Sequence, residues 1–363
     1  MVKAAIYGAG AMGGVLGALI EKSGGKVDLF ARNAVHVQAV RENGLTLRCV
    51  ADGVSFTVRP EIFTPDDLPA RTQKNGKYDV IFLMTKQREN GKIVTFLKDF
   101  LSENGALVTT QNGLPEAEIA NIVGENRTFG GVCSFGANFE TAGEALLTST
   151  LASAKICVGA YRKNSIPNGC TSAQMSEQIQ NIRNLLQPIS KITNGNFYRE
   201  TQNLAGVRYA KLVVNAAFSS LSAATGLTFG EIAKDKKAKK IALGVMRETL
   251  DVAKAQNIKI DTVQGRDVAK LLHKSKLPFG AVKDKILLLL LPKFVKNHQN
   301  SVSGMLLDIR RGRRSEIDYI AGAVSEAGKI YGIKTPLCDR LVQIVKAVEN
   351  GEAELTKANC NVL

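Results

Sequence analysis

Residue types that mark whole classes of protein are scarce in this chain of 363 residues. Tryptophan is absent, histidine occurs three times, and the six cysteines are scattered without a C-x-x-C pair. This cysteine pattern argues against a zinc site and a disulfide framework, and it favours a reducing, cytoplasmic location. Zinc-finger spacing and an aromatic RNA-binding signature are also missing, which argues against nucleic acid as a partner.

Long hydrophobic runs are missing as well. The longest notable apolar run, Ile286–Leu291, is far too short to span a bilayer, and we predict that it is a buried helix segment. The N-terminus enters an apolar strand at once, which is not the pattern of a signal peptide. His36, His273 and His298 stand in no recognisable constellation, so we predict neither a metal site nor a histidine acid.

The overall composition is that of an ordinary globular protein. Hydrophobic residues make up 45% of the chain and charged residues 22%, and the length favours two domains. Lysine and arginine total 48 against 33 acids, which gives a formal net charge of +15. An excess of positive charge suits anionic ligands such as phosphates and carboxylates.

A glycine pattern near the N-terminus organises the first half of the chain. The apolar residues 4–7 predict a buried strand, and Gly8, Gly10 and Gly13 follow in the spacing G-x-G-x-x-G before a helical stretch over residues 11–23. Gly8 permits a tight turn, Gly10 lets the backbone approach a pyrophosphate, and Gly13 lets the helix pack on the sheet. The sequence therefore predicts a dinucleotide site.

The next strand indicates which dinucleotide binds. Ala11 and Met12 open the helix, whose free N–H groups face the phosphates. The second strand, residues 27–31, ends at Arg32, where an NAD site usually has an acid that bonds the ribose. Asp28 comes too early in the strand for that role. A guanidinium suits a 2′-phosphate, so we predict NADPH as the cofactor, with a solvated Arg32 as the alternative.

Two further strands end in polar residues. The apolar run over residues 79–85 is followed by Lys86, and the run over residues 106–110 is followed by Gln111 and Asn112. Ligands bind at the carboxyl ends of parallel strands, so we predict that Lys86 and Asn112 line the pocket. The alternative for Asn112 is that it only forms a turn with the next glycine.

These elements predict an α/β fold with two domains. Residues 1–200 form a Rossmann-type, NADPH-binding domain, and residues 201–363 form an all-helical substrate and catalytic domain, because apolar residues adopt a helical period from about residue 202. The turn at Ala142 and Gly143 predicts antiparallel strands added to the edge of the main sheet.

The helical half holds a second group of polar residues. Lys211 and Asn215 are spaced i and i+4 and share one helix face. A lysine beside apolar side chains is costly to keep charged, which would make it a proton donor near neutral pH. We expect Glu316, after Ser315, to open another helix. The alternatives are a surface lysine and an ordinary first-turn acid.

Together these motifs resemble the ketopantoate reductase family, NADPH-dependent reductases of 2-dehydropantoate. The motifs that carry the resemblance run in the family's order along nearly the whole chain: GAGAMG over residues 8–13, Thr85-Lys86-Gln87, Gln111-Asn112-Gly113, Lys211-Leu-Val-Val-Asn215 and Arg311-Gly-Arg-Arg-Ser-Glu316-Ile-Asp-Tyr-Ile320. The resemblance implies hydride transfer from NADPH to a 2-keto carbon, Lys211 as general acid and Glu316 as the acid that holds the substrate's hydroxyl. It also implies that Lys86 and Asn112 lie beside nicotinamide and substrate, and that Asn215 binds substrate.

The chain departs from the best-known bacterial members around the substrate. Those members have asparagines where this chain has Ser219, Phe229 and Ser301, and a serine where it has Gly304. Ser303 stands one residue from the expected serine and could replace it. The substrate is therefore ketopantoate or another small 2-keto acid, reduced directly or condensed with an amine, with a non-catalytic NADPH-binding regulator as a further alternative. Monomer and homodimer both stay open, because no interface signal is visible.

Overall fold

The computed structural model describes residues 2–162, 173–262, 265–272 and 280–363. The chain divides into two compact units. The first consists of Met1–Gln111 and Pro115–Leu204, and the second of Asn112–Leu114 and Ala205–Leu363. His273 and Cys170 lie outside the described residues.

The first unit is built on an eight-stranded sheet with the order β12-β11-β8-β7-β6-β1-β2-β5. Its neighbouring strands are parallel, except that β11 runs antiparallel to β8. In sheet order the strands span Tyr198–Glu200, Ile156–Ala160, Thr128–Cys133, Leu101–Thr109, Tyr78–Leu83, Ala4–Tyr7, Asp28–Phe30 and Ile62–Phe63.

The order of the strands reverses between β1 and β6. From β1 the chain proceeds to β2 on one side of the sheet and later returns to β6 on the other side. Open α/β sheets bind ligands at such a switch point, beyond the carboxyl ends of the strands. The residues that follow Tyr7 and Leu83 therefore occupy the expected place for a ligand.

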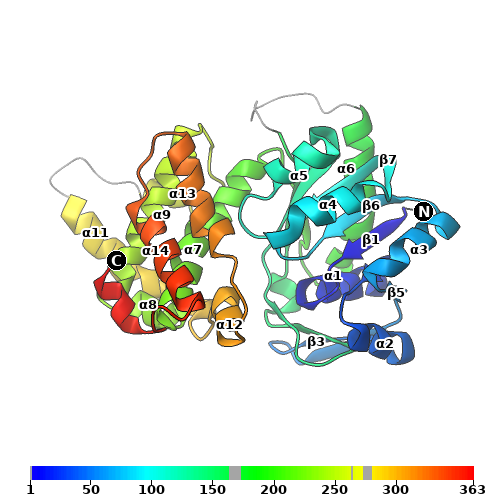
Figure 1. The fold of residues 1–363 in the computed structure, drawn as a ribbon, viewed down its shortest axis with the longest axis horizontal. Coiled ribbons are helices and arrows are strands. Elements are labelled where there is room, and N and C mark those ends of the chain that lie inside the picture. Colours follow the sequence, from blue (N-terminus) through cyan, green and yellow to red (C-terminus); the bar gives the residue numbers. More distant parts are fainter. Residues whose placement is uncertain (1, 163–172, 263–264, 273–279) are drawn as a thin grey trace. The chain divides into compact units, whose positions relative to one another are not determined.

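Helices cover both faces of this sheet (Figure 1). Side chains of α1 (Ala11–Lys22) and α6 (Ala173–Leu186) share a core with Ala4 and Ile6 of β1. Side chains of α3 (Leu68–Asn75), α4 (Asn90–Lys98) and α5 (Glu116–Val123) share another core with Ala5 and Tyr7. The alternation along β1 is the period of two expected for a strand between two layers, which confirms the Rossmann-like α/β architecture.

A separate four-stranded sheet has the order β4-β3-β10-β9. Its strands are Val54–Val58, Leu45–Cys49, Glu144–Leu147 and Ala137–Asn138. The prediction that the strands flanking Gly143 extend the main sheet was wrong, because β10 pairs in parallel with β3. The buried side chains of this sheet lie in the same core as α1: Leu45, Leu47, Ala145 and Leu147. The sheet therefore packs over α1 and does not extend the main sheet.

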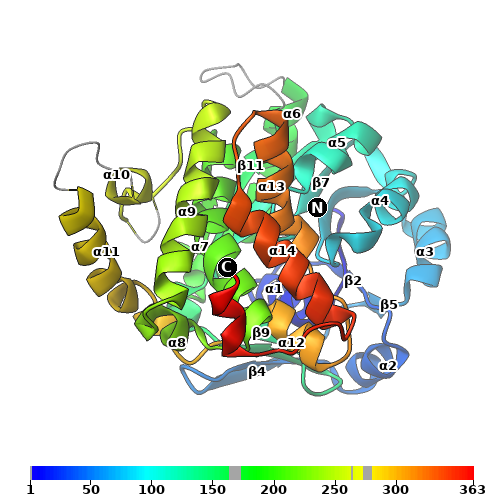
Figure 2. The ribbon, with the colours of Figure 1, turned by 60° about the vertical axis from the view of Figure 1, so that its left-hand side comes forward.

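The second unit is helical. Its longer helices are α7 (Leu204–Thr225), α9 (Ala238–Ala255), α11 (Gly280–Phe294), α13 (Ala321–Ile330) and α14 (Pro336–Glu349). The shorter ones are α8 (Phe229–Lys234), α10 (Val268–Leu272) and α12 (Gly304–Arg310). Helices α9, α13 and α14 pack against one another around one hydrophobic core (Figure 2). In the described part of the chain, no helix is both long and apolar enough to cross a membrane.

The apolar run in α11 is helical as predicted, but it is not buried throughout. Ile286, Leu289 and Leu290 are 52%, 72% and 42% exposed, whereas Leu291 is buried. Helix α11 packs on α8 and α9 through one stripe, so residues on the opposite stripe face away from the core. Because leucines occupy every face of this run, the sequence does not indicate which stripe is buried.

Candidate active site

The glycine turn (Gly8–Gly13) connects β1 to α1 at the switch point. The N–H groups of Gly8 and Ala9 donate to the Phe30 carbonyl at 3.0 and 2.9 Å, which ties the turn to the end of β2. Gly8 has φ +105, and a Cβ there would lie 2.7 Å from the Thr85 nitrogen. Only glycine suits this position, since its conformation is left-handed and the neighbouring loop is close.

Gly10 and Gly13 meet different constraints. A Cβ on Gly10 would have no heavy atom within 4 Å, so the space above this residue is open. A Cβ on Gly13 would strike the Gly8 carbonyl oxygen and lie 3.0 Å from Ile6 Cγ2. Gly10 precedes α1 without a side-chain cap, and Ala11 and Met12 are half-buried in the first turn. The N–H groups of this turn are therefore available to an anion.

Arg32 lies in the loop between β2 and α2 (Ala34–Asn43). Its side chain is 77% exposed, and Nη1 lies 3.4 Å from Oε2 of Glu89, which is 54% exposed. Burial raises the pKa of the Tyr7 phenol at the end of β1, while Arg32 lowers it and Asp66 and Glu89 raise it. Arg32 and two acids thus gather near the end of β1, and an exposed ion pair of this kind is weak enough to exchange partners.

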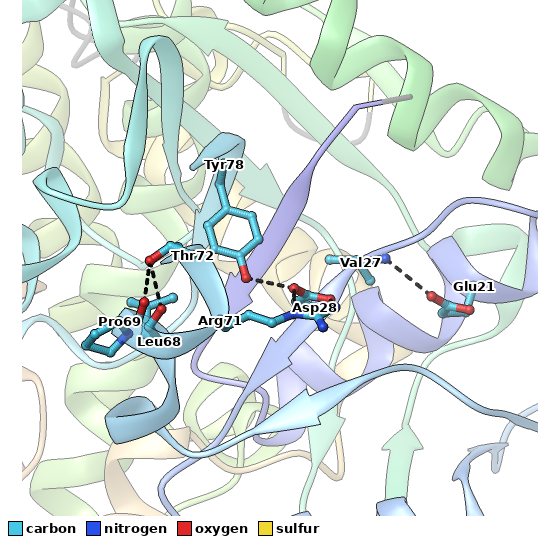
Figure 3. A network of polar contacts seen from close by, with 8 residues as sticks. All are labelled: Glu21, Val27, Asp28, Leu68, Pro69, Arg71, Thr72 and Tyr78. Atoms are coloured by element: carbon cyan, nitrogen blue, oxygen red, sulfur yellow. Dashed lines mark hydrogen bonds and ion pairs between the residues drawn. The ribbon is translucent and has the colours of Figure 1, made fainter. Parts of the chain in front are cut away.

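Asp28 is committed to a structural network (Figure 3). It aligns with Ala5, two residues before the carboxyl end of β1. Arg71 donates to both carboxylate oxygens at 2.8 and 2.9 Å, and the Tyr78 hydroxyl donates at 2.7 Å. Burial and the neighbouring carboxylate raise the pKa of Tyr78. Asp28 therefore links β2, α3 and β6.

Lys86 follows β6 and Asn112 follows β7, and these two strands are neighbours in the sheet. Lys86 is exposed at the start of the short turn Gln87–Glu89, and Asn112 is half-buried. Gln111 joins the two loops, because its Nε2 donates to the Thr85 carbonyl at 2.9 Å and to Asn90 Oδ1 at 2.7 Å.

Asn90 also donates a hydrogen bond to Gln111, so the two side-chain amides form a reciprocal pair. Its Nδ2 donates to Gln111 Oε1 at 3.1 Å, and both side chains are buried. The pair fixes the loops that carry Lys86 and Asn112. Asn90 is not predicted from the sequence, because a buried asparagine at a helix start has no local signature.

Helix α7 carries Lys211, Asn215 and Ser219 at successive helical turns. Lys211 and Asn215 are half-buried, between buried side chains of Leu212 and Ala216. The Ser219 hydroxyl donates to the Asn215 Oδ1 atom, which fixes the amide's orientation. The helix thus aligns an amine, an amide and a hydroxyl along one face.

The segment that contains Ser301 and Ser303 packs on the same part of this unit. The Ser303 N–H donates to the Ser222 hydroxyl of α7 at 3.2 Å, and Ser303 Oγ accepts from Leu306 N at 3.0 Å as the cap of α12. The Phe229 N–H donates to the Ser301 carbonyl at 3.0 Å. Residues predicted for the substrate shell are therefore joined by hydrogen bonds within the helical unit.

Phe229 and Gly304 differ in their surroundings. The Phe229 ring packs against Phe218 with centroids 5.8 Å apart, and it lies against the core. Gly304 is exposed, and a Cβ there would have no heavy atom within 4 Å. A larger residue would fit at Gly304, whereas Phe229 is held by packing.

Glu316 is half-buried, but it does not open a helix as expected. It precedes a single 3-10 turn, Ile317–Tyr319, and α13 begins only at Ala321. The Ser315 N–H donates to Glu349 Oε1 at 2.7 Å, and the Ile317 N–H to Ser315 Oγ at 3.3 Å. These bonds satisfy the backbone around Glu316, so the acid sits on a fixed loop.

Comparison with known proteins connects these features. A family model described as ketopantoate reductase PanE/ApbA matches residues 4–163, and the model of its C-terminal part matches residues 203–349. A 2-dehydropantoate 2-reductase of Lactococcus lactis subsp. lactis is 27% identical over 354 residues, which cover 97% of this chain and 98% of the relative.

Solved structures share the fold. A PanE/ApbA family ketopantoate reductase from Ralstonia eutropha JMP134 superimposes with a TM-score of 0.73 at 21% identity, over 97% of this chain and 99% of that one. D-mandelate dehydrogenase, solved with NADH and anilino(oxo)acetate, gives a TM-score of 0.73 at 23% identity with the same coverage of both chains.

Proposed function

Because the chain belongs to the ketopantoate reductase family, an oxidoreductase family, we propose that it reduces 2-dehydropantoate to pantoate with NADPH, in pantothenate and coenzyme A biosynthesis. The observation that carries this proposal is the face of α7 that presents Lys211, Asn215 and Ser219 together. In this proposal residues 1–200 bind NADPH, and residues 201–363 bind the substrate and supply the proton.

The glycine turn and its neighbours suit NADPH. The open space over Gly10 and the N–H groups at the start of α1 fit a pyrophosphate, and the exposed guanidinium of Arg32 fits a 2′-phosphate. Bound NADPH supplies the hydride. Lys86 and Asn112, on the loops joined by Gln111, would contact nicotinamide and substrate.

The helical unit would supply the proton and stabilise the negative charge that develops on the substrate oxygen. Lys211 donates a proton to the alkoxide that forms at the 2-carbon, and its positive charge stabilises that oxygen while it forms. Asn215 hydrogen-bonds the substrate, with Ser219 holding the amide. Glu316 accepts a hydrogen bond from the substrate's hydroxyl and orients Lys211. Ser303 contributes by capping α12 and by tying it to Ser222 of α7.

A second candidate is the reduction of a different small 2-keto acid. The observation that favours it is that Phe229 and Ser301 stand where the best-known relatives have asparagines, and that the Phe229 ring packs on Phe218. Without these two amides, the site would suit a less polar keto acid. A non-catalytic NADPH sensor has no need for Lys211 and Glu316.

The test follows NADPH oxidation by absorbance with 2-dehydropantoate and a panel of other 2-keto acids, with and without amines. We expect Lys211→Ala to lower turnover roughly 10²- to 10⁴-fold while NADPH binding persists. Lys254→Ala on exposed α9 surface is the matched control and should turn over normally. Rapid reduction of another keto acid, but not of 2-dehydropantoate, would select the second candidate. Full activity of Lys211→Ala would refute the assigned acid.

A further inference from the structure

His36 is a buried polar side chain with no role in the proposed reaction. It lies in the first turn of α2, close behind Arg32 in the chain, and it is 1% exposed. Its Nδ1 accepts a hydrogen bond from the Gly143 N–H at 3.0 Å. Because Nδ1 acts as acceptor, the neutral ring carries its proton on Nε2.

The His36 ring lies between the Phe139 ring and the backbone of Ala9. On one side it packs edge-on against Phe139, with centroids 5.0 Å apart, in the segment that leads to Gly143. Burial lowers the pKa of the ring, and the nearby backbone of Ala9 has a smaller, opposite effect on that pKa. Ala9 is fully buried in the middle of the glycine turn.

The same region supports α1. Gly143 precedes β10, and a Cβ on Gly14 of α1 would lie 3.1 Å from the Cβ of Ala145 in that strand. The strand β10 therefore approaches the first turns of α1 closely, and His36 bonds the backbone where this strand begins. A shift of the ring would reach both the glycine turn and the start of α1.

We propose that His36 is a positioning residue for NADPH: wedged between Ala9 and Gly143, it holds the glycine turn and the Arg32 loop in the geometry that receives the phosphates. The inference rests on the proposed function. It predicts that His36 acts on cofactor affinity and leaves the chemical step alone. Without the imidazole, the Gly143 N–H is left buried and unpaired, and the turn loses its support.

The experiment compares His36→Leu and His36→Asn in the full-length chain. NADPH binding is titrated by fluorescence, and kcat and the KM for NADPH are measured separately. We expect His36→Leu to weaken NADPH binding roughly tenfold, as for an unpaired buried N–H, with kcat at saturating NADPH unchanged. The amide oxygen of His36→Asn can accept from Gly143, so this variant should recover most of the affinity. His298→Leu on an exposed residue is the matched control.

Each outcome decides a separate question. If His36→Leu folds and binds NADPH as tightly as the natural chain, the positioning role is refuted and the proposed function stands. A fall in kcat with an unchanged KM would also overturn it. If the natural chain itself fails to bind NADPH, the proposed function is refuted. Should His36→Leu not fold, Phe139→Leu, which removes the ring packing that positions His36, replaces it and should raise the KM for NADPH without changing kcat.

Discussion

Replacing Gly10 by alanine should separate cofactor binding from folding. No heavy atom lies within 4 Å of the Cβ that alanine would add, but the backbone at φ −86 and ψ −139 lies outside the regions that L-residues favour. The free energy of unfolding should therefore fall by about 1 kcal/mol through this strain, which is less than a steric clash would cost. The methyl group would occupy the space through which the pyrophosphate reaches the N–H groups of α1. Losing one hydrogen bond to a charged group costs about 1.5–3 kcal/mol, or roughly 10- to 150-fold in the Kd for NADPH.

Two other glycines make this prediction specific. Gly304→Ala also adds a Cβ into open space, but in the helical unit, so NADPH affinity should not change. Gly13→Ala forces a Cβ onto the Gly8 carbonyl, and this crowding should lower the free energy of unfolding by about 1–3 kcal/mol. Fluorescence titration with NADPH and urea denaturation measure the two quantities. If Gly10→Ala folds and binds NADPH normally, the glycine turn does not hold the pyrophosphate.

Three further predictions concern charge and capping. Arg32→Ala should raise the KM for NADPH roughly tenfold or more and leave the KM for NADH unchanged, and equal effects on both cofactors would contradict this. Glu89→Gln removes an ion pair worth about 0.2–1 kcal/mol that competes with the 2′-phosphate for Arg32, so it should lower the KM for NADPH slightly. Ser303→Ala removes the cap of α12 and should cost about 1 kcal/mol in urea denaturation. Because the pKa of His36 is lowered in the folded chain, the free energy of unfolding should fall as the pH drops below about 6.5, and His36→Asn should flatten this slope.

The sequence predicts elements best where the constraint is local. The turn after β1 is recognisable because Gly8 and Gly13 each meet backbone within the same loop or the next one. The hairpin around Gly143 shows the limit of local signals. Gly143 has φ +84, so the predicted turn is present. The sheet that β10 joins is determined by its pairing with β3, which lies far earlier in the chain. The uniformly apolar run in α11 likewise cannot reveal which of its faces packs.

The residues of the candidate site also differ in whether local sequence signals predict them. Strand order alone predicts that Lys86 and Asn112 lie near each other, because the carboxyl ends of parallel strands share one edge. The residues that hold these loops, Asn90 and Gln111, have partners that only the folded chain brings near. Glu316 was expected to open a helix because an acid before apolar residues is typical of a first turn. The bond from Ser315 to Glu349 of α14 instead fixes a single 3-10 turn there.

This division bears on how the two halves of the proposed site tolerate change. The cofactor half depends on backbone: Gly8 and Gly13, which have no room for a Cβ, and N–H groups at the start of α1. Neither of these glycines can be replaced without moving the loop, so the sequence motif stays recognisable. The substrate half depends on side chains, such as Ser219 on Asn215, and on backbone bonds that any residue can form, such as Phe229 to Ser301. Substitutions there alter hydrogen bonding without disturbing α7, which explains how the chain keeps the motifs of a keto-acid reductase while its substrate shell differs from that of the best-known members.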